Sequence, residues 1–301
     1  MDRKSAADAN LITEKYLDSI LIEERIIDTK AADLTTTFLG ETFSMPVMMP
    51  AFSHLKAYNG RELTGLEEYS IAAKNLNVLN FCGMMENDLY QKIADTGAKT
   101  VRIVKPYEDD GKVRDQLAFA KEAGAFAVGI DIDHIFGDAG YDVVIGEKMT
   151  YQTVEKLADY AAVTGLPFIV KGVLSVQDAV KSAQAGAKAI IVSHHHGRLP
   201  FAVPPVLALP RIKEALEGTG MEIIVDCSIA SGADVYKCLA LGEDAAAVGR
   251  AMLPALEKDG VSGVEAVFGK IASELRFVMS MSGFERVEDI DSSALWLPNT
   301  Y

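Results

Sequence analysis

The chain alternates short apolar runs with longer amphipathic stretches from about residue 46 onward. Eight of the runs are apolar throughout rather than at every second position, and they lie near 46–52, 77–82, 100–104, 126–132, 167–171, 188–193, 222–227 and 244–248. Continuous apolar runs of this length are typical of strands that are buried on both faces, as in parallel sheets. The pattern therefore predicts eight buried parallel strands.

Stretches with helical periodicity separate and follow these strands. They lie near 62–75, 87–96, 112–124, 151–164, 176–186, 206–217, 232–241 and 261–281. Gly165 and Gly242 stand just past two of them, where glycine commonly ends a helix, and Ser175 is a residue type that begins one. Eight strand–helix pairs in succession favour a single (β/α)₈ barrel, with a doubly wound open sheet as the alternative.

No linker, low-complexity segment or charge run divides the sequence, so we expect one domain over residues 1–301. The barrel is predicted to span 46–283, between an N-terminal extension (1–45) and a C-terminal tail (284–301). The extension is expected to contain helical segments and an extended Thr35-Thr36-Thr37. We expect it to cap the bottom of the barrel or its rim.

The composition narrows the classes of partner. Apolar residues make up 49% of the chain, the net charge is −14 and the pI is about 4.8. This acidity argues against nucleic acid or an anionic membrane as the main partner. Three scattered cysteines (Cys82, Cys227 and Cys238) form no CxxC pair and fit a reducing compartment. No apolar stretch approaches the ~20 residues of a membrane span, so a cytoplasmic protein is expected.

Polar residues gather where the predicted strands end. They are Asp131 and Asp133 on the fourth strand, Lys171 on the fifth, Ser193-His194-His195-His196-Gly197-Arg198 after the sixth, Asp226 and Ser228 after the seventh, and Gly249 and Arg250 after the eighth. In a (β/α)₈ barrel, the chemistry takes place at these carboxyl ends. Successive residues of a strand point in opposite directions, so of the two aspartates we expect only Asp131 to point inward.

The loops after strands seven and eight favour a phosphate group. Phosphate sites in this fold are frequent at these two loops. Backbone amides near Ser228 and Gly249, with the Arg250 guanidinium, suit a phosphate monoester. A zinc site at the three adjacent histidines is disfavoured because consecutive residues point apart, so no metal is predicted.

The motifs also carry a family resemblance. Residues 166–198 resemble the FMN-dependent α-hydroxy acid oxidase and dehydrogenase family, which includes glycolate oxidase, lactate oxidase and flavocytochrome b2. Further matching segments follow in family order: Thr35 to Gly40 with Met45 to Met48, Asp234 to Gly242, and Met279 to Gly283. The resemblance covers about residues 34–290 and marks the chain as a divergent, short member.

The resemblance implies roles for individual residues. His195 falls on the catalytic base, Asp131 on its aspartate partner and Arg198 on the arginine that binds the substrate carboxylate. It places Lys171 at the pyrimidine edge of the flavin and Ser228, Gly249 and Arg250 at the phosphate. Ser193, Asp226, Lys105 and Ala51 are further expected cofactor contacts, Tyr107 is an expected substrate contact, and His195 and Arg198 also bind the substrate.

These roles are chemically consistent with one another. Oxidation of a 2-hydroxy acid needs a base for the hydroxyl proton, and a histidine with a carboxylate partner can supply it. A cation beside the flavin stabilises the reduced ring, and a guanidinium grips a carboxylate at two points. The expected activity is oxidation of a small 2-hydroxy acid to the 2-oxo acid with FMN. The family usually forms tetramers, so a homo-oligomer is expected.

Departures from the family pattern keep alternatives open. His194 and His196 replace a smaller Asn and Gly, and Ala230 and Ser231 replace two phosphate-loop arginines. The segment Ile103 to Tyr107 aligns in two ways: with a gap, Lys105 faces the flavin and Tyr107 replaces the substrate tyrosine; without one, that tyrosine is lost. The alternatives are an FMN-dependent isomerase of the isopentenyl-diphosphate type and a cofactor-free barrel that acts in binding.

Overall fold

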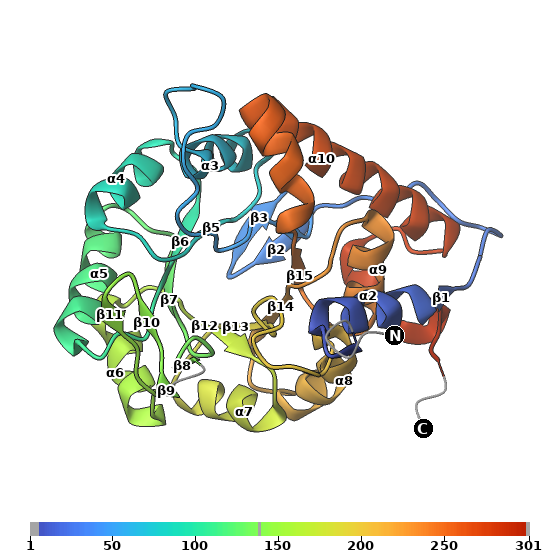
Figure 1. Ribbon diagram of the computed structural model, residues 1–301. Helices are drawn as coiled ribbons and strands as arrows, with labels where there is room; N and C mark the ends of the chain where they lie inside the picture. The colour runs from blue at the N-terminus through green and yellow to red at the C-terminus, as the bar shows by residue number, and fades with distance from the viewer. Residues whose placement is uncertain (1–5, 138–139, 299–301) are drawn as a thin grey trace.

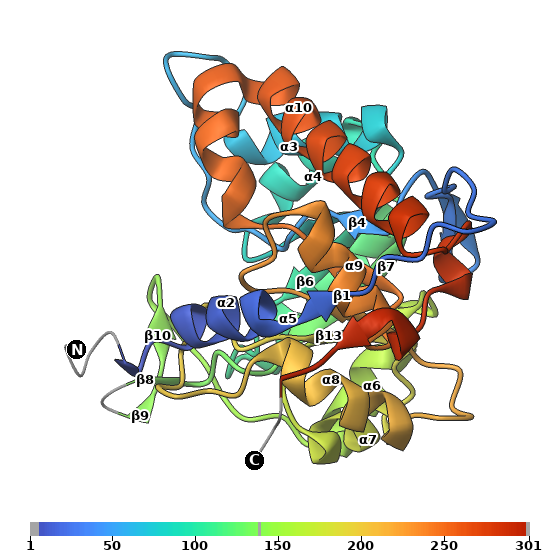
Figure 2. The same cartoon turned by 90° about the vertical axis from the view of Figure 1, so that its right-hand side faces the viewer.

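The computed structural model describes residues 6–137 and 140–298, and its centre is an eight-stranded parallel sheet. The strand order is β4-β15-β14-β13-β12-β7-β6-β5. The sheet closes on itself because the Met49 amide donates to the Leu79 carbonyl (3.0 Å) and Phe52 bridges to Cys82. Helices surround this barrel (Figures 1 and 2). The predicted (β/α)₈ fold is confirmed, and the open sheet is excluded.

The strands and helices follow the predicted alternation. The strands are β4 (Val47–Met48), β5 (Asn80–Cys82), β6 (Thr100–Val104), β7 (Ala127–Asp131), β12 (Phe168–Val173), β13 (Ala189–Val192), β14 (Glu222–Val225) and β15 (Ala245–Ala247). The outer helices are α3 (Gly65–Leu76), α4 (Asn87–Asp95), α5 (Asp110–Glu122), α6 (Val154–Thr164), α7 (Val176–Gln184), α8 (Pro205–Ala215), α9 (Gly232–Ala240) and α10 (Leu253–Met281). α10 starts earlier than expected because it continues across a kink at Gly260, whose φ is 61°.

Two apolar layers hold the barrel together. One fills its interior and includes Met48, Phe81, Ile169 and Ile224, all nearly inaccessible to solvent. The other lies between the strands and the outer helices. Each strand is therefore buried on both faces, which is why its sequence is apolar without alternation.

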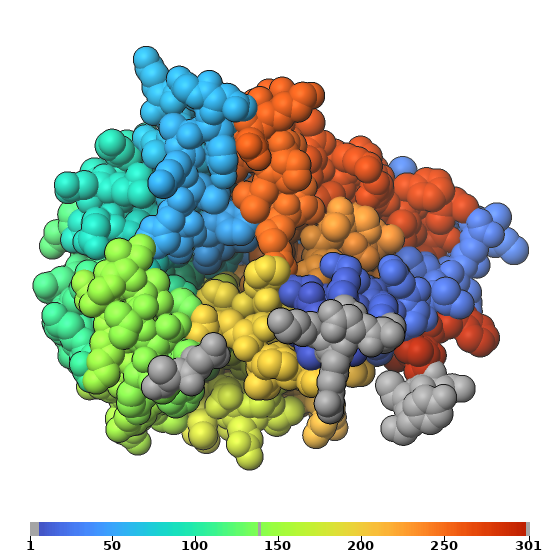
Figure 3. Space-filling view, viewed as in Figure 1, coloured from blue at the N-terminus to red at the C-terminus, as the bar shows by residue number. Residues whose placement is uncertain are grey.

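The N-terminal extension covers both ends of the barrel. A hairpin of β2 (Thr36–Phe38) and β3 (Glu41–Phe43) inserts Phe38 and Phe43 into the inner apolar layer at the bottom. Helix α2 (Ala9–Ser19) instead lies at the opposite end, beside the loops that follow β13 and β14. In Figure 3 this blue helix lies against the yellow segment that follows β13.

The remaining short elements complete the surface. β1 (Leu21–Ile22) pairs with β16 (Leu295–Trp296), so the extension and the tail meet. Two hairpins follow β7, formed by β8 (Phe136–Gly137) with β9 (Gly140–Tyr141) and β10 (Val143–Val144) with β11 (Glu147–Lys148). Short 3₁₀ turns lie at Arg250–Met252, Val287–Asp289 and Ser292–Ala294. No helix among the described residues is long and apolar enough to cross a membrane.

Candidate active site

A cavity of about 920 Å³ opens at the carboxyl ends of the barrel strands. It gathers predicted residues from five strand ends: Ala51, Lys171, His195, Asp226, Ser228, Gly249 and Arg250. Helix α2 supplies another wall through Asp8, Asn10, Leu11 and Glu14. Parallel strands all end on the same rim, and this is why residues nearly 200 positions apart line one cavity.

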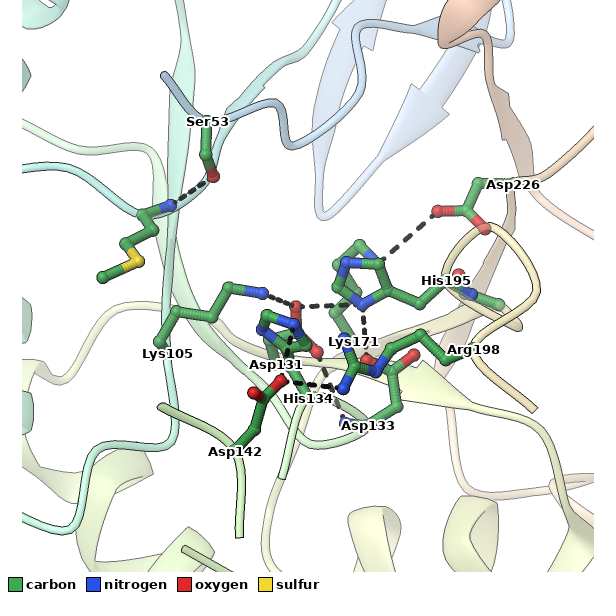
Figure 4. Close-up of polar contacts among 12 residues, drawn as sticks. Ser53, Lys105, Asp131, Asp133, His134, Asp142, Lys171, His195, Arg198 and Asp226 are labelled. Atoms are coloured by element: carbon green, nitrogen blue, oxygen red, sulfur yellow. Dashed lines mark hydrogen bonds and ion pairs between the residues drawn. The ribbon is translucent and has the colours of Figure 1, made fainter. Parts of the chain in front are cut away.

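His195 lies at the centre of a network of charged groups (Figure 4). Its Nδ1 is 2.5 Å from Asp133 Oδ1 and 3.4 Å from Asp131 Oδ2. The same Asp131 oxygen is 2.6 Å from Lys105 Nζ, and both of these side chains are buried. The side chains of Lys105, Asp131 and His195 thus lie in a row in which a carboxylate separates two basic groups.

The prediction that only Asp131 points inward is wrong. β7 ends at Asp131, so Asp133 lies in the loop beyond it, where the alternation of a strand no longer applies. Asp133 turns back and makes the shorter contact with His195. The alternation rule failed because it was extended past the last paired residue.

The network shifts the pKa values of its members. Burial raises the pKa of Asp131, but Lys105 and His195 outweigh burial and hold this pKa well below its usual range. Burial and the charge of Asp131 raise the pKa of Asp133 to about 6. Burial lowers the pKa of His195, but the charge of Asp131 and the contacts with both carboxylates leave it above its ordinary value. The carboxylates thus stabilise the protonated form of His195, as a histidine that accepts a proton requires.

Lys171 is a buried cation at the cavity wall. It is only 6% exposed, and its Nζ lies 3.7 Å from Asp226 Oδ2. Burial lowers the pKa of Lys171, but the carboxylates of Asp226 and Asp131 raise it above its ordinary value. The ammonium group therefore stays charged at neutral pH and available to an electron-rich ring edge.

The two histidines beside His195 anchor α2. His194 Nε2 lies 3.0 Å from Thr13 Oγ1, and His196 Nδ1 lies 2.9 Å from Asn10 Oδ1. Asn10 Oδ1 also accepts a hydrogen bond from Arg250 Nη2 at 2.9 Å. The three adjacent histidines thus have three different partners rather than one common ligand.

Two loops of the cavity carry strained backbone. His195 and His196 have φ values of 45° and 61°, and Cys227 and Ser228 have values of 77° and 58°. Left-handed backbone is rare for residues other than glycine, and such strain concentrates at functional sites. Ser193 supports the first loop: it is buried, and its Oγ accepts a hydrogen bond from the His195 amide. It does not line the cavity, so its effect on a cofactor is indirect.

The loop after β14 differs from a typical phosphate site. The Ala230 and Ser231 amides both donate to Asp234 Oδ2, at 3.1 and 3.0 Å, within the cap of α9. Among the described residues, the amides of Cys227, Ser228 and Gly249 have no protein acceptor. These amides and Arg250 remain available to an anion.

Arg198 and Tyr107 lie outside the cavity wall. Arg198 Nη2 donates to the Phe136 carbonyl (2.6 Å) and to Asp142 Oδ2 (2.9 Å), which joins it to the hairpin of β8 and β9. Tyr107 is 1% exposed, and Lys112 Nζ lies 5.0 Å from its ring centre. The expected substrate contact of Tyr107 is not supported, because this buried residue lies beside Lys112 of α5, bridges to Met149 and does not line the cavity. The position of Tyr107 agrees with the alignment without a gap, in which the substrate tyrosine is lost. Lys105 pairs with Asp131 and does not line the cavity, so its expected contact with the flavin stays a prediction.

Several residues of the site carried no usable sequence signal. Asn10, Thr13 and Asp142 contact residues more than 50 positions away, and no local pattern marks these pairings. His134 packs 5.2 Å from His195, ring centre to ring centre. Burial and Lys105 lower its pKa to about 4.

Within the described parts of the chain, Asp131, Asp133 and His195 form the one cluster with metal-ligand spacing, their ligand atoms lying within 4.8 Å. The Lys105 ammonium already binds Asp131 there. The absence of a metal stays a prediction.

Comparisons with known proteins agree on one family. The chain matches the family described as FMN-dependent dehydrogenase over residues 4–139 and 137–297. It is 27% identical to an L-lactate oxidase of Nostoc sp., over 90% of this chain and 85% of the relative. It is 29% identical to glycolate oxidase 3 of Arabidopsis thaliana, over 90% and 83% of the two chains.

Solved structures give the same result. A mandelate oxidase variant with a monooxide FMN adduct has a TM-score of 0.86 and 28% identity, over 96% of this chain and 92% of that chain. A mandelate oxidase with benzoyl-formic acid has a TM-score of 0.86 and 26% identity, over 98% and 93%. The resemblance and fold expected from the sequence are thereby confirmed.

Proposed function

This chain belongs to the FMN-dependent dehydrogenase family, and from that premise we propose that it oxidises a small 2-hydroxy acid to the 2-oxo acid at the cavity around His195. One observation carries the proposal: a paired histidine, a buried lysine and an anion cradle all lie on one cavity rim. This set matches the needs of the reaction, namely a base, a cation for the flavin and a grip for its phosphate.

The cavity residues fit FMN. Lys171 is the proposed contact for the pyrimidine edge of the flavin, and Arg250 with the Ser228 and Gly249 amides is the proposed site for the phosphate; all four residues line the cavity. Asp226 also lines the cavity and pairs with Lys171 at 3.7 Å, and Ala51 adds a small side chain to the wall. Bound FMN supplies the acceptor for the hydride equivalent that leaves the substrate carbon.

His195 is the proposed base. Its Nδ1 faces two aspartates, so Nε2 is the ring nitrogen left for the substrate hydroxyl. The neutral ring accepts the proton, and the carboxylates then stabilise the imidazolium. Because the pKa of His195 is raised, activity should increase as the pH rises through that pKa.

Arg198 is the proposed contact for the substrate carboxylate. Among the residues that the structure describes, both hydrogen bonds of the guanidinium come from Nη2, so Nε and Nη1 have no described partner and are the proposed donors to a carboxylate. Asp142 and the Phe136 carbonyl hold the guanidinium beside the loop of His195. A planar fork held in this way suits two-point binding.

The two alternatives make different demands on the cavity. An isomerase that acts on a diphosphate needs additional cations, whereas α2 presents Asp8 and Glu14 to the cavity. A cofactor-free binding protein would not take up FMN. A cytoplasmic location and a homo-oligomer, with a tetramer as the family's usual state, remain proposals.

The test is anaerobic mixing of FMN-loaded protein with L-lactate, glycolate and mandelate. Oxidised flavin absorbs near about 450 nm, and a substrate should bleach this band. Bleaching by at least one of these acids, but not by the matching 2-oxo acid, supports the proposal. FMN uptake without bleaching by any 2-hydroxy acid would favour the isomerase, and no uptake would favour the binding protein.

A further inference from the structure

His195 has two carboxylate neighbours, and their contacts differ in kind. Asp133 Oδ1 lies 2.5 Å from Nδ1, which is a short charge-assisted hydrogen bond. Asp131 Oδ2 lies 3.4 Å from the same nitrogen, and it also binds Lys105 Nζ at 2.6 Å. The shorter contact of Asp131 is therefore with Lys105, whereas the shorter contact of His195 is with Asp133.

The backbone beside Asp133 is shaped to admit its carboxyl group. Gly172 has a φ of +91°, and a Cβ at this position would lie 2.5 Å from the Asp133 Cγ. The pairing of β12 with β13 shifts register between Lys171 and Val173, around this glycine. A side chain at position 172 would displace Asp133, so the glycine and the aspartate form one local structure.

The Asp133 carboxylate has no second partner among the described residues. Its Oδ2 is buried and has no hydrogen-bond partner among the described residues. The titratable groups that face His195 are Asp131 at the end of β7, Asp133 and His134 in the loop after it, and Lys171 on β12, with Lys105 behind Asp131. The two carboxylates differ in their partners: Asp131 binds Lys105, whereas the side-chain hydrogen bond of Asp133 within the described residues goes to His195.

We propose that Asp133 is the positioning residue for His195, whereas Asp131, bonded to Lys105, supplies charge at longer range. The Nδ1 proton is held by Asp133, which fixes the tautomer and turns Nε2 toward the cavity. Asp131 stabilises the protonated ring without orienting it. The catalytic meaning of this division rests on the proposed oxidation, but the hydrogen bond itself does not.

The first test is NMR of FMN-loaded protein labelled with ¹⁵N in its histidine rings. The short bond should give a strongly downfield Nδ1 proton, assigned by its loss in His195→Gln. We expect Asp133→Asn to abolish this resonance and Asp131→Asn to retain it. The exposed Asp88→Asn on α4 is the control with the same change of charge and should retain it. Retention in Asp133→Asn with loss in Asp131→Asn would overturn the proposal.

The second test is the pH profile of anaerobic flavin reduction by whichever of L-lactate, glycolate or mandelate reduces the wild type. Asp133→Asn should lower the rate about 10²-fold at every pH, a typical effect of misdirecting a base, and Asp133→Glu should restore part of it. Asp131→Asn should mainly move the rise in rate to lower pH. An unchanged rate in Asp133→Asn would contradict the proposal.

The outcomes separate the two levels of inference. If no acid reduces the wild-type flavin, the proposed oxidation fails while the NMR result still decides the role of Asp133. Gly172→Ala provides an independent check, because the added Cβ should displace Asp133 and remove the downfield resonance. Persistence of that resonance in folded Gly172→Ala would count against the proposal.

Discussion

Replacing Lys105 with methionine should destabilise the protein strongly. Lys105 and Asp131 have side chains that are 8% and 3% exposed, and their charged atoms lie 2.6 Å apart. Removing one partner of a buried pair typically costs about 3–5 kcal/mol, because the other charge stays buried without compensation. His195 still faces Asp131, so we expect the lower end, about 3 kcal/mol in the free energy of unfolding.

The effect should depend on pH with a defined sign. The pKa of Asp131 is depressed in the folded protein, so its ion pairs stabilise the fold above the unfolded pKa of about 3.9. This contribution is lost as the pH falls through the lower, folded pKa. The difference between Lys105→Met and wild type should therefore be full at pH 7 and shrink in acid.

The assay is urea unfolding at several pH values. Lys258→Met is the matched control, since the Lys258 side chain is 80% exposed and should cost within about 0.5 kcal/mol. The double variant Lys105→Met/Asp131→Asn removes both charges and should recover at least about 1 kcal/mol relative to the single variant. A loss below about 1 kcal/mol in Lys105→Met would refute the reasoning that this buried pair neutralises Asp131.

Three further substitutions test the site. His195→Ala should slow anaerobic flavin reduction about 10²–10⁴-fold in stopped-flow measurements, with little change in FMN affinity. Loss of reduction in His194→Ala, with reduction intact in His195→Ala, would show that the base is misplaced. Arg198→Lys should raise the substrate concentration for half-maximal reduction, because an ammonium cannot reproduce the fork; an unchanged value would remove Arg198 from the substrate. Asn10→Ala should weaken FMN binding in fluorescence titrations, because it frees α2 from His196 and Arg250; unchanged affinity would mean that α2 does not organise the phosphate end.

The barrel could be predicted from the sequence because strands buried on both faces have continuous apolar sequences. Ala189–Val192 and Glu222–Val225, for example, have almost no exposed position between them. The positions of Lys171, His195 and Arg250 at strand ends then identified them as candidate site residues, because all eight strands of this fold end at one rim. Periodicity and topology were sufficient for this part of the site.

The remaining contacts depend on geometry that sequence patterns do not encode. Asp133 reaches His195 only because the chain leaves the strand after Asp131 and Gly172 makes room for it. Asn10 joins His196 and Arg250 across 186 and 240 positions of sequence. Such contacts arise from how loops fold over the rim, and a helix pattern alone does not place α2 there.

The most direct test of the proposed function is a single anaerobic turnover of FMN-loaded protein with a 2-hydroxy acid that bleaches the flavin. The 2-oxo acid is measured chemically and compared with the amount of FMN reduced. We predict one molecule of 2-oxo acid per FMN reduced in the wild type, and neither product nor bleaching on the same timescale in His195→Ala. Bleaching without 2-oxo acid, or equal turnover in His195→Ala, would contradict the account.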